Sequence, residues 1–239
     1  MLKLNNLSVS VGKKQILSNI DFQFEPDKVY AVMGPNGSGK STLGYSIAGH
    51  PAYEVTSGQI VFNNEDITEE EPEKRAEKGI FLSFQSPLQI AGVTVFQLLR
   101  LALEGKVDPL ELRNKINRIA KELKIRDELL NRSLNEGASG GERKKLELLQ
   151  AVVLDPKFLI LDEIDTGVDV DALKIIGSYI DKIKKGRTIV LITHYNRILK
   201  YIKPDYVLVL VNGRLVKVGK KDLAHQIEEQ GYESLNSNL

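Results

Sequence analysis

Apolar and polar residues alternate at the start of the chain, and this alternation predicts short strands. Between Leu2 and Phe24 apolar side chains recur mostly at every second position, and Gly12 with two lysines interrupts the series. A period of two around a turn is typical of a hairpin that buries one face. The run Val29–Met33 is apolar throughout, which predicts a strand buried on both faces, as in a parallel sheet.

The rest of the chain separates into strand-like runs and one long helical stretch. A helix is expected from Lys40 to about Gly49, and a short, highly charged one within 68–78. Residues 94 to about 154 are expected to be mainly helical, because their apolar positions lie three or four residues apart. Strands are expected at Gln59–Phe62, Gly79–Ser83, Phe158–Leu161, Thr188–Ile192, Tyr206–Val211 and Arg214–Val218, with a hairpin turn at Asn212-Gly213. This order predicts an α/β core interrupted by a helical lobe.

Composition and charge narrow the classes of protein to which the chain can belong. Its 239 residues are 42% hydrophobic, and 33 basic residues face 32 acidic ones, for a net charge of +1. Sequence-independent binding of nucleic acid requires an excess of basic over acidic residues, so no nucleic-acid partner is expected. No apolar run approaches the roughly 20 residues of a membrane helix, so direct membrane insertion is not expected. The chain has no cysteine, which excludes disulfides and thiolate-held metals and fits a cytoplasmic protein.

The segment after the first buried strand matches a phosphate-binding loop. Residues 34–41 fit the pattern G-x-x-x-x-G-K-[ST] completely. The glycines let the backbone wrap around phosphate oxygens, and the positive end of the next helix lies behind them. In this interpretation Lys40 neutralises the β- and γ-phosphates and the Ser41 hydroxyl ligates Mg²⁺. The expected nucleotide-binding residues are Gly34, Pro35, Asn36, Gly37, Ser38, Gly39, Lys40, Ser41 and Thr42.

Two carboxylates close a later strand. Asp162 and Glu163 directly follow the apolar run Phe158–Leu161. Ligands of open α/β sheets bind at the carboxyl ends of strands, so Asp162 is expected to hold the Mg²⁺ shell. Glu163 is expected to face the γ-phosphate and to polarise an attacking water. Two solvated acids would be the simpler interpretation of this pair alone, but the phosphate loop makes it the weaker one.

A second segment with a phosphate-binding design lies upstream of these acids. Ser139, Gly140, Gly141 and Glu142 stand at the start of a helical pattern, with small side chains, free backbone N–H groups and a hydroxyl. One chain needs only one phosphate cradle, so a second suggests contact with the nucleotide of another molecule. A plain serine-capped helix explains this segment alone at least equally well.

As a set, these motifs resemble those of the ABC-type ATPases over essentially the whole chain. The resemblance implies ATP and Mg²⁺ as cofactors and a P-loop NTPase (RecA-like) core of the α/β class, with an antiparallel β subdomain and an inserted α-helical subdomain. Residues 1–85 and 151–239 would form the catalytic core, and residues 86–150 the helical subdomain that carries the signature segment. Ala138 and Glu142 depart from the Leu and Gln that usually flank Ser-Gly-Gly in this family.

The resemblance also implies roles for further residues. Gln85 resembles the glutamine that touches Mg²⁺ and water, and Asp169 the aspartate of the loop that crosses the dimer interface. His194 resembles the histidine that senses the γ-phosphate. The implied catalytic set is therefore Glu163, His194, Lys40 and Gln85, and the implied metal set is Ser41, Gln85 and Asp162. Val11 stands where the family usually stacks adenine on an aromatic ring, so weak base discrimination is expected.

Several segments resemble one branch of the family, the SufC-type ATPases of iron–sulfur cluster assembly. They include Thr193–Leu199, Ile202–Val207 and Glu228–Tyr232. The branch implies an ATP-dependent homodimer that remodels a SufB/SufD-type scaffold. Any cluster would then lie on a partner, because this chain has no thiolate to hold one. Two alternatives stay open: the ATP-binding subunit of a membrane ABC transporter, and a GTP-dependent switch, which the signature segment disfavours.

Overall fold

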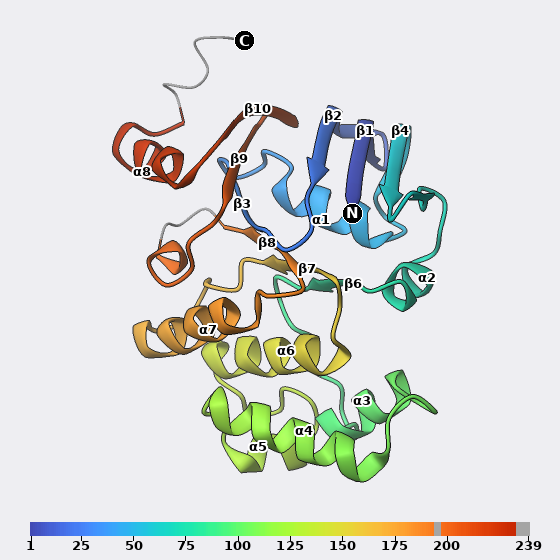
Figure 1. Ribbon diagram of the computed structural model, residues 1–239, viewed down its shortest axis with the longest axis vertical. Coiled ribbons are helices and arrows are strands. Elements are labelled where there is room, and N and C mark those ends of the chain that lie inside the picture. Colours follow the sequence, from blue (N-terminus) through green and yellow to red (C-terminus); the bar gives the residue numbers. More distant parts are fainter. Residues whose placement is uncertain (194–196, 233–239) are drawn as a thin grey trace.

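The strands form two sheets in the computed structural model, which describes residues 1–193 and 197–232 (Figure 1). One sheet is antiparallel, with strand order β2-β1-β4-β5, and the larger one has the order β10-β9-β3-β8-β7-β6. The strands are β1 (Leu2–Val11), β2 (Lys14–Phe24), β3 (Val29–Met33), β4 (Glu54–Phe62), β5 (Glu65–Asp66), β6 (Ile80–Ser83), β7 (Phe158–Asp162), β8 (Thr188–Ile192), β9 (Tyr206–Val211) and β10 (Arg214–Gly219).

The helices surround the larger sheet and extend below it in Figure 1. They are α1 (Lys40–Ala48), α2 (Pro72–Glu77), α3 (Val95–Ala102), α4 (Pro109–Glu122), α5 (Asp127–Asn131), α6 (Gly140–Leu154), α7 (Val170–Ile183), α8 (Lys221–Gln230) and the 3₁₀ turn η1 (Ile198–Lys200). None of the helices in the described ranges is both long and apolar enough to cross a membrane. The expected alternation of strands, a helical block and strands is therefore confirmed.

The predicted hairpin is present, but its neighbour β4 is longer than expected. β1 pairs antiparallel with β2 around the turn at Gly12, and with β4 on its other side. β4 begins at Glu54 rather than near Gln59, because its first half pairs with β1 through the backbone while its side chains are largely exposed. Strand pairing without a buried face leaves no apolar pattern to read.

Strand β3 is buried on both faces, as its continuous apolar run predicts. It lies between β8 and β9 and runs parallel to both. Tyr30 and Val32 pack into the apolar cluster shared with α1 and the antiparallel sheet. Val29, Ala31 and Met33 pack into the opposite cluster, which includes α6, α7 and α8. The larger sheet is thus the middle layer of the molecule, and the loop after β3 leaves from its centre.

The helical stretch is divided more finely than its periodicity suggests. The helical pattern expected over residues 94 to about 154 breaks after α4, where Lys124 adopts a left-handed backbone with φ 51° before α5 begins. α6 continues from Gly140 to Leu154, across the expected subdomain boundary at residue 150. The proposed division of the chain into a core and a helical subdomain therefore stays a prediction.

A buried arginine fastens the far end of α1. Arg75 on α2 is 3% exposed, and its guanidinium donates to the carbonyls of Ser46 and Ile47 in the last turn of α1, at 2.8 and 3.1 Å. It also donates to the carbonyls of Glu70 and Thr68, at 2.8 and 2.7 Å. A cation at a helix C-terminus opposes the negative end of the helix dipole, so Arg75 stabilises the helix that carries Lys40.

Candidate active site

The conformation of the loop between β3 and α1 requires glycine at two positions. A Cβ atom on Gly34 would lie 2.1 Å from the carbonyl oxygen of Leu210, closer than any real contact. Gly39 has φ 98°, and a Cβ there would lie 2.5 Å from a methyl group of Leu17. The turn after β9 supports the loop as well, since the Gly213 N–H donates to the Ser38 carbonyl at 3.1 Å. The loop is a tight cradle held from two sides.

Lys40 lies inside this cradle. Its ammonium donates to the carbonyls of Gly34 at 2.8 Å and Pro35 at 3.0 Å, and the residue is 5% exposed. Burial lowers the pKa of Lys40, and the charges of Glu163 and Asp162 act in the opposite direction. A cation held among carbonyl oxygens and facing two acids can exchange those contacts for the oxygens of a phosphate.

Asp162 lies at the end of β7, next to the first turn of α1. The Ser41 hydroxyl donates to Asp162 Oδ1 at 3.2 Å, and the Asp162 N–H donates to the Ser83 hydroxyl at 2.9 Å. Asp162 is fully buried, and burial raises the pKa of its carboxyl to about 6. Its second oxygen, Oδ2, has no hydrogen-bond partner among the described residues.

These groups fit a Mg²⁺ ion. A buried carboxylate oxygen without a donor can take a cation as its partner, and a hydroxyl lies beside it. The described residues contain no cluster of three or more His, Cys, Asp or Glu side chains that could hold a metal by themselves. Mg²⁺ is usually held by one or two carboxylates together with substrate phosphates and water. Ser41 and Asp162 could therefore hold the ion only when phosphates complete its shell.

Glu163 and Gln85 meet across the mouth of the cradle. The Gln85 side-chain amide donates to Glu163 Oε2 at 2.7 Å, and the Thr166 hydroxyl donates to the same oxygen at 3.4 Å. Glu163 has a left-handed backbone with φ 47°, and its N–H donates to the Ile192 carbonyl at 2.9 Å. A non-glycine residue in this conformation costs free energy, and here it turns the carboxylate from the strand direction towards the loop.

A cavity of about 500 Å³ joins these groups, lined by Lys14, Ile16, Asn36, Gly37, Gly39, Lys40, Ser41, Thr42, Gln85 and Glu163. Most of the expected site residues of the core are therefore brought together. Lys14 and Ile16 come from β2, where no motif marks them, and sequence reasoning missed both. Val11 is 38% exposed at the end of β1 and does not belong to the lining.

The signature segment lies elsewhere in the chain and forms a helix N-cap. The Ser139 hydroxyl accepts the Glu142 N–H at 3.3 Å, and Glu142 Oε2 accepts the Ser139 N–H at 2.9 Å. Arg126 donates to both oxygens of Glu142. This ion pair is the main cause that lowers the pKa of Glu142 to about 2. None of these residues lines the cavity at the phosphate loop.

The signature segment packs against the loop before α7. A Cβ atom on Gly140 would lie 2.7 Å from the Gly167 carbonyl oxygen, so only glycine allows this approach. Asp169 is the N-cap of α7, and its Oδ1 accepts the Ala172 N–H at 2.8 Å. The two segments expected at a dimer interface thus lie side by side. His194, which the sequence places in the catalytic set, lies outside the described residues.

A buried ion pair on α6 holds the backbone that carries Gln85, and sequence reasoning missed it. Lys144 Nζ donates to the carbonyls of Phe84 and Gln85, both at 2.9 Å. Glu147 Oε1 accepts the Phe84 N–H at 2.6 Å, and its other oxygen lies 3.8 Å from Lys144 Nζ. Burial raises the pKa of Glu147 to about 7 and lowers that of Lys144. Charged residues within a helical pattern usually indicate a solvent-exposed face, so the sequence does not indicate that this pair is buried.

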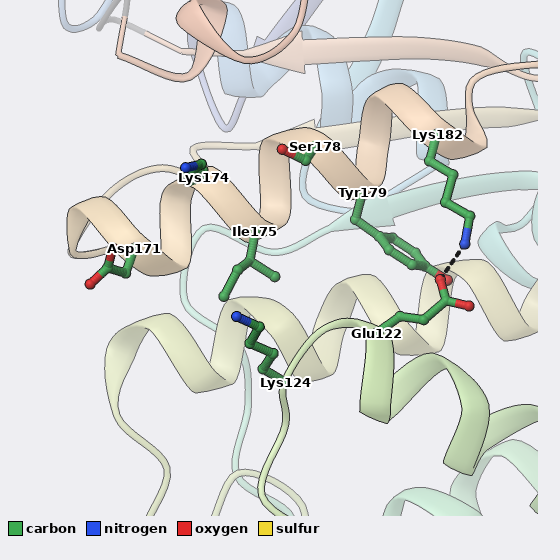
Figure 2. A pocket seen from close by; sticks show the side chains of 8 residues that line it. All are labelled: Glu122, Lys124, Asp171, Lys174, Ile175, Ser178, Tyr179 and Lys182. Carbon is green, nitrogen blue, oxygen red and sulfur yellow. Dashed lines mark hydrogen bonds and ion pairs between the residues drawn. The ribbon is translucent and has the colours of Figure 1, made fainter.

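A second cavity, of about 770 Å³, is larger but lacks this chemistry (Figure 2). It lies between α7 and the end of α4. There Lys182 forms an ion pair with Glu122, and the Lys182 ammonium lies 5.7 Å from the centre of the Tyr179 ring. The cations on its walls are surface lysines on flexible stems, which make a weak case for a specific site. We therefore assign the functional site to the phosphate loop.

Comparison with known proteins decides the family. A family model described as ABC transporter matches residues 17–166. The chain belongs to the ABC transporter family. It is 46% identical over 245 residues to a probable ATP-dependent transporter, ycf16, of Antithamnion sp., covering 99% of this chain and 98% of the relative. It is 44% identical over 241 residues to the probable ATP-dependent transporter SufC of Escherichia coli strain K12, covering 97% of both.

Solved structures agree with this placement. The ATP-binding cassette MJ1267 of an ABC transporter has a TM-score of 0.81 and 28% identity, covering 99% of this chain and 98% of that one. The dimeric cassette MJ0796 bound to ADP and Pi has a TM-score of 0.80 at 21% identity, covering 92% and 98%, which shows a common fold. The expected P-loop NTPase fold of the ABC type is confirmed, and the chain is a SufC-like ABC ATPase that binds and hydrolyses ATP.

Proposed function

We propose that this ATPase serves iron–sulfur cluster assembly, where a cycle of Mg²⁺-ATP binding and hydrolysis drives its dimerisation and the remodelling of a SufB/SufD-type scaffold. The observation that supports this most is the 44% identity to Escherichia coli SufC, which extends over 97% of both chains. The cluster would be cargo of the scaffold, since this chain has no cysteine.

In the proposed reaction, each core residue has one task. Lys40 leaves the carbonyls of Gly34 and Pro35 and neutralises the β- and γ-phosphates. Ser41 and Asp162 would hold Mg²⁺, which supplies charge for the oxygens of the transferred phosphoryl group. Glu163 accepts the proton of a water that attacks the γ-phosphorus, while the bond to the β-phosphate oxygen breaks.

Gln85 is well placed to orient Glu163. Its amide donates to Glu163 Oε2 at 2.7 Å, so it fixes the position of the carboxylate beside the phosphate loop. We propose that Gln85 also contacts Mg²⁺, and that His194 senses the γ-phosphate, as the family resemblance implies. Each role requires the site to be filled with nucleotide.

The second half of the proposed site comes from another copy of the chain. Ser139, Gly140 and Gly141 do not line the cavity of their own chain. A two-fold pair would place them, with Glu142 and Asp169, over the γ-phosphate bound by the partner. ATP then stabilises the closed pair because both chains bind its γ-phosphate, and hydrolysis removes that contact. Partners docked near Gln85 would be drawn together and released in each cycle.

The partner can be identified by capture of the tagged chain from its own cells, followed by mass spectrometry with and without ATP. Recovery of scaffold proteins that carry iron and sulfide supports the proposal. Recovery of membrane-spanning subunits instead would favour a transporter ATPase. That alternative deserves a test because several relatives are called probable transporters and the similar solved structures are transporter cassettes.

The two-chain site can be tested by mixing two inactive variants, Lys40→Ala and Ser139→Arg, in the presence of scaffold. A mixed pair contains one site with both lesions and one with neither, so part of the ATPase activity should return. Absence of any recovery, although mixed dimers are detected by native mass spectrometry, would show that each site is built from one chain.

A further inference from the structure

The end of the described chain folds back onto the phosphate loop. Helix α8 buries Leu223, Ala224 and Ile227 in the apolar cluster on one face of the larger sheet. Gly231 ends the helix with a left-handed φ of 71°, and its N–H donates to the Ile227 carbonyl at 2.9 Å. This turn brings the Tyr232 ring, half-buried, against the same cluster.

The Tyr232 hydroxyl reaches the first residue of the phosphate loop. The buried N–H of Gly34 donates to it at 3.1 Å, across a separation of 198 residues. Gly34 lies close against the backbone of β9, since a Cβ atom there would lie 2.1 Å from the Leu210 carbonyl oxygen. Its own carbonyl accepts the Lys40 ammonium at 2.8 Å. Gly34 thus contacts Tyr232, strand β9 and the Lys40 ammonium.

We propose that Tyr232 is a positioning residue of the phosphate loop, holding Gly34 so that its carbonyl and Lys40 are in place before nucleotide binds. A buried N–H needs an acceptor, and the Tyr232 hydroxyl supplies it from outside the loop motif. Without that oxygen the Gly34 peptide must either remain unpaired or turn towards another acceptor. Either change alters the cradle that Lys40 completes.

Two further features support this role. Burial raises the pKa of Tyr232, so its hydroxyl stays neutral over the usual assay range and the contact does not change with pH there. The other end of the loop is also held from the C-terminal part of the chain, through the Gly213 N–H and the Ser38 carbonyl. The hairpin of β9 and β10 and the segment from α8 to Tyr232 therefore hold the loop at both ends. Nucleotide binding should in turn stabilise the segment from α8 to Tyr232.

The test compares Tyr232→Phe with Tyr201→Phe in the full chain. Tyr201 is the matched control, because it is also half-buried against the same cluster and its hydroxyl makes no hydrogen bond within the described ranges. We expect Tyr232→Phe to weaken Mg²⁺-ATP binding about 3- to 10-fold in equilibrium titration and to raise KM with little change in kcat. Tyr201→Phe should match the wild type. A role in folding alone would lower the active fraction, and with it kcat, at unchanged KM.

A second measurement reads the loop directly. Amide hydrogen exchange at Gly34, without nucleotide, should be roughly 3- to 10-fold faster in Tyr232→Phe and unchanged in Tyr201→Phe. Equal ATP affinity and equal Gly34 exchange in the Tyr232 variant and the wild type would overturn the proposal. Equal losses in both tyrosine variants would overturn it as well. Both measurements use the isolated chain and depend only on its own phosphate loop and ATPase activity, so a failure of the iron–sulfur proposal leaves their outcome unaffected.

Discussion

Removal of the Lys144 ammonium, by Lys144→Met, should destabilise the chain in a way that depends on pH. The Phe84 and Gln85 carbonyls would each lose a donor at 2.9 Å, and Glu147 would lose the cation 3.8 Å away. The side chains of Lys144 and Glu147 are only 4% and 7% exposed, so water can replace few of these lost contacts. Breaking such a buried pair from one side costs about 3–5 kcal/mol of unfolding free energy. We expect that cost at pH 8.

The pH dependence follows from Glu147. Burial raises the pKa of Glu147 from 4.5 to about 7 in the folded chain. A carboxyl whose pKa is higher when folded contributes stability that is complete below its unfolded pKa and disappears as pH rises through the folded value. At pH 5 the folded Glu147 is neutral and needs no cation. The cost of Lys144→Met should therefore be smaller at pH 5 than at pH 8.

Urea denaturation of the nucleotide-free chain, followed by circular dichroism at both pH values, measures these differences. The matched variant Lys144→Met/Glu147→Gln keeps an acceptor for the Phe84 N–H but removes the charge. At pH 8 it should be about 1–3 kcal/mol more stable than the single variant. Equal costs at pH 5 and pH 8, with no recovery in the double variant, would refute the reasoning.

Three further predictions concern the site and its support. Glu163→Gln should lower phosphate release about 10²- to 10⁴-fold and leave ATP binding intact, because the shape beside Gln85 is kept and the base is lost; near-normal turnover would contradict this. Arg75→Met should lower the free energy of unfolding in urea by about 3 kcal/mol, since four carbonyls lose their donor. The exposed control Arg100→Met should cost under about 0.5 kcal/mol. Val11→Tyr should tighten ATP binding roughly 3- to 10-fold by stacking on adenine; unchanged affinity in a titration would mean that adenine is held elsewhere.

Some of the architecture can be read from local pattern because each element carries its own signal. The buried strand before the loop shows as an unbroken apolar run, and the Asn212-Gly213 turn shows by residue type. Strand β4 and the break after α4 could not be read in this way. The first half of β4 is defined by pairing with β1, and the break depends on one left-handed residue, Lys124.

The sequence by itself determined which chemical groups this protein carries: a phosphate loop, an acidic strand end and a signature segment, each a short run whose chemistry depends on adjacent residues. Only the tertiary structure decided which distant groups meet them. Three sets of contacts join residues far apart in the chain: that of Gln85 with Glu163, those of Lys144 and Glu147 with the backbone of Phe84 and Gln85, and that of Tyr232 with Gly34. Such contacts leave no local pattern, because they arise where the layers of the fold close on one another and bury polar groups that must then be paired.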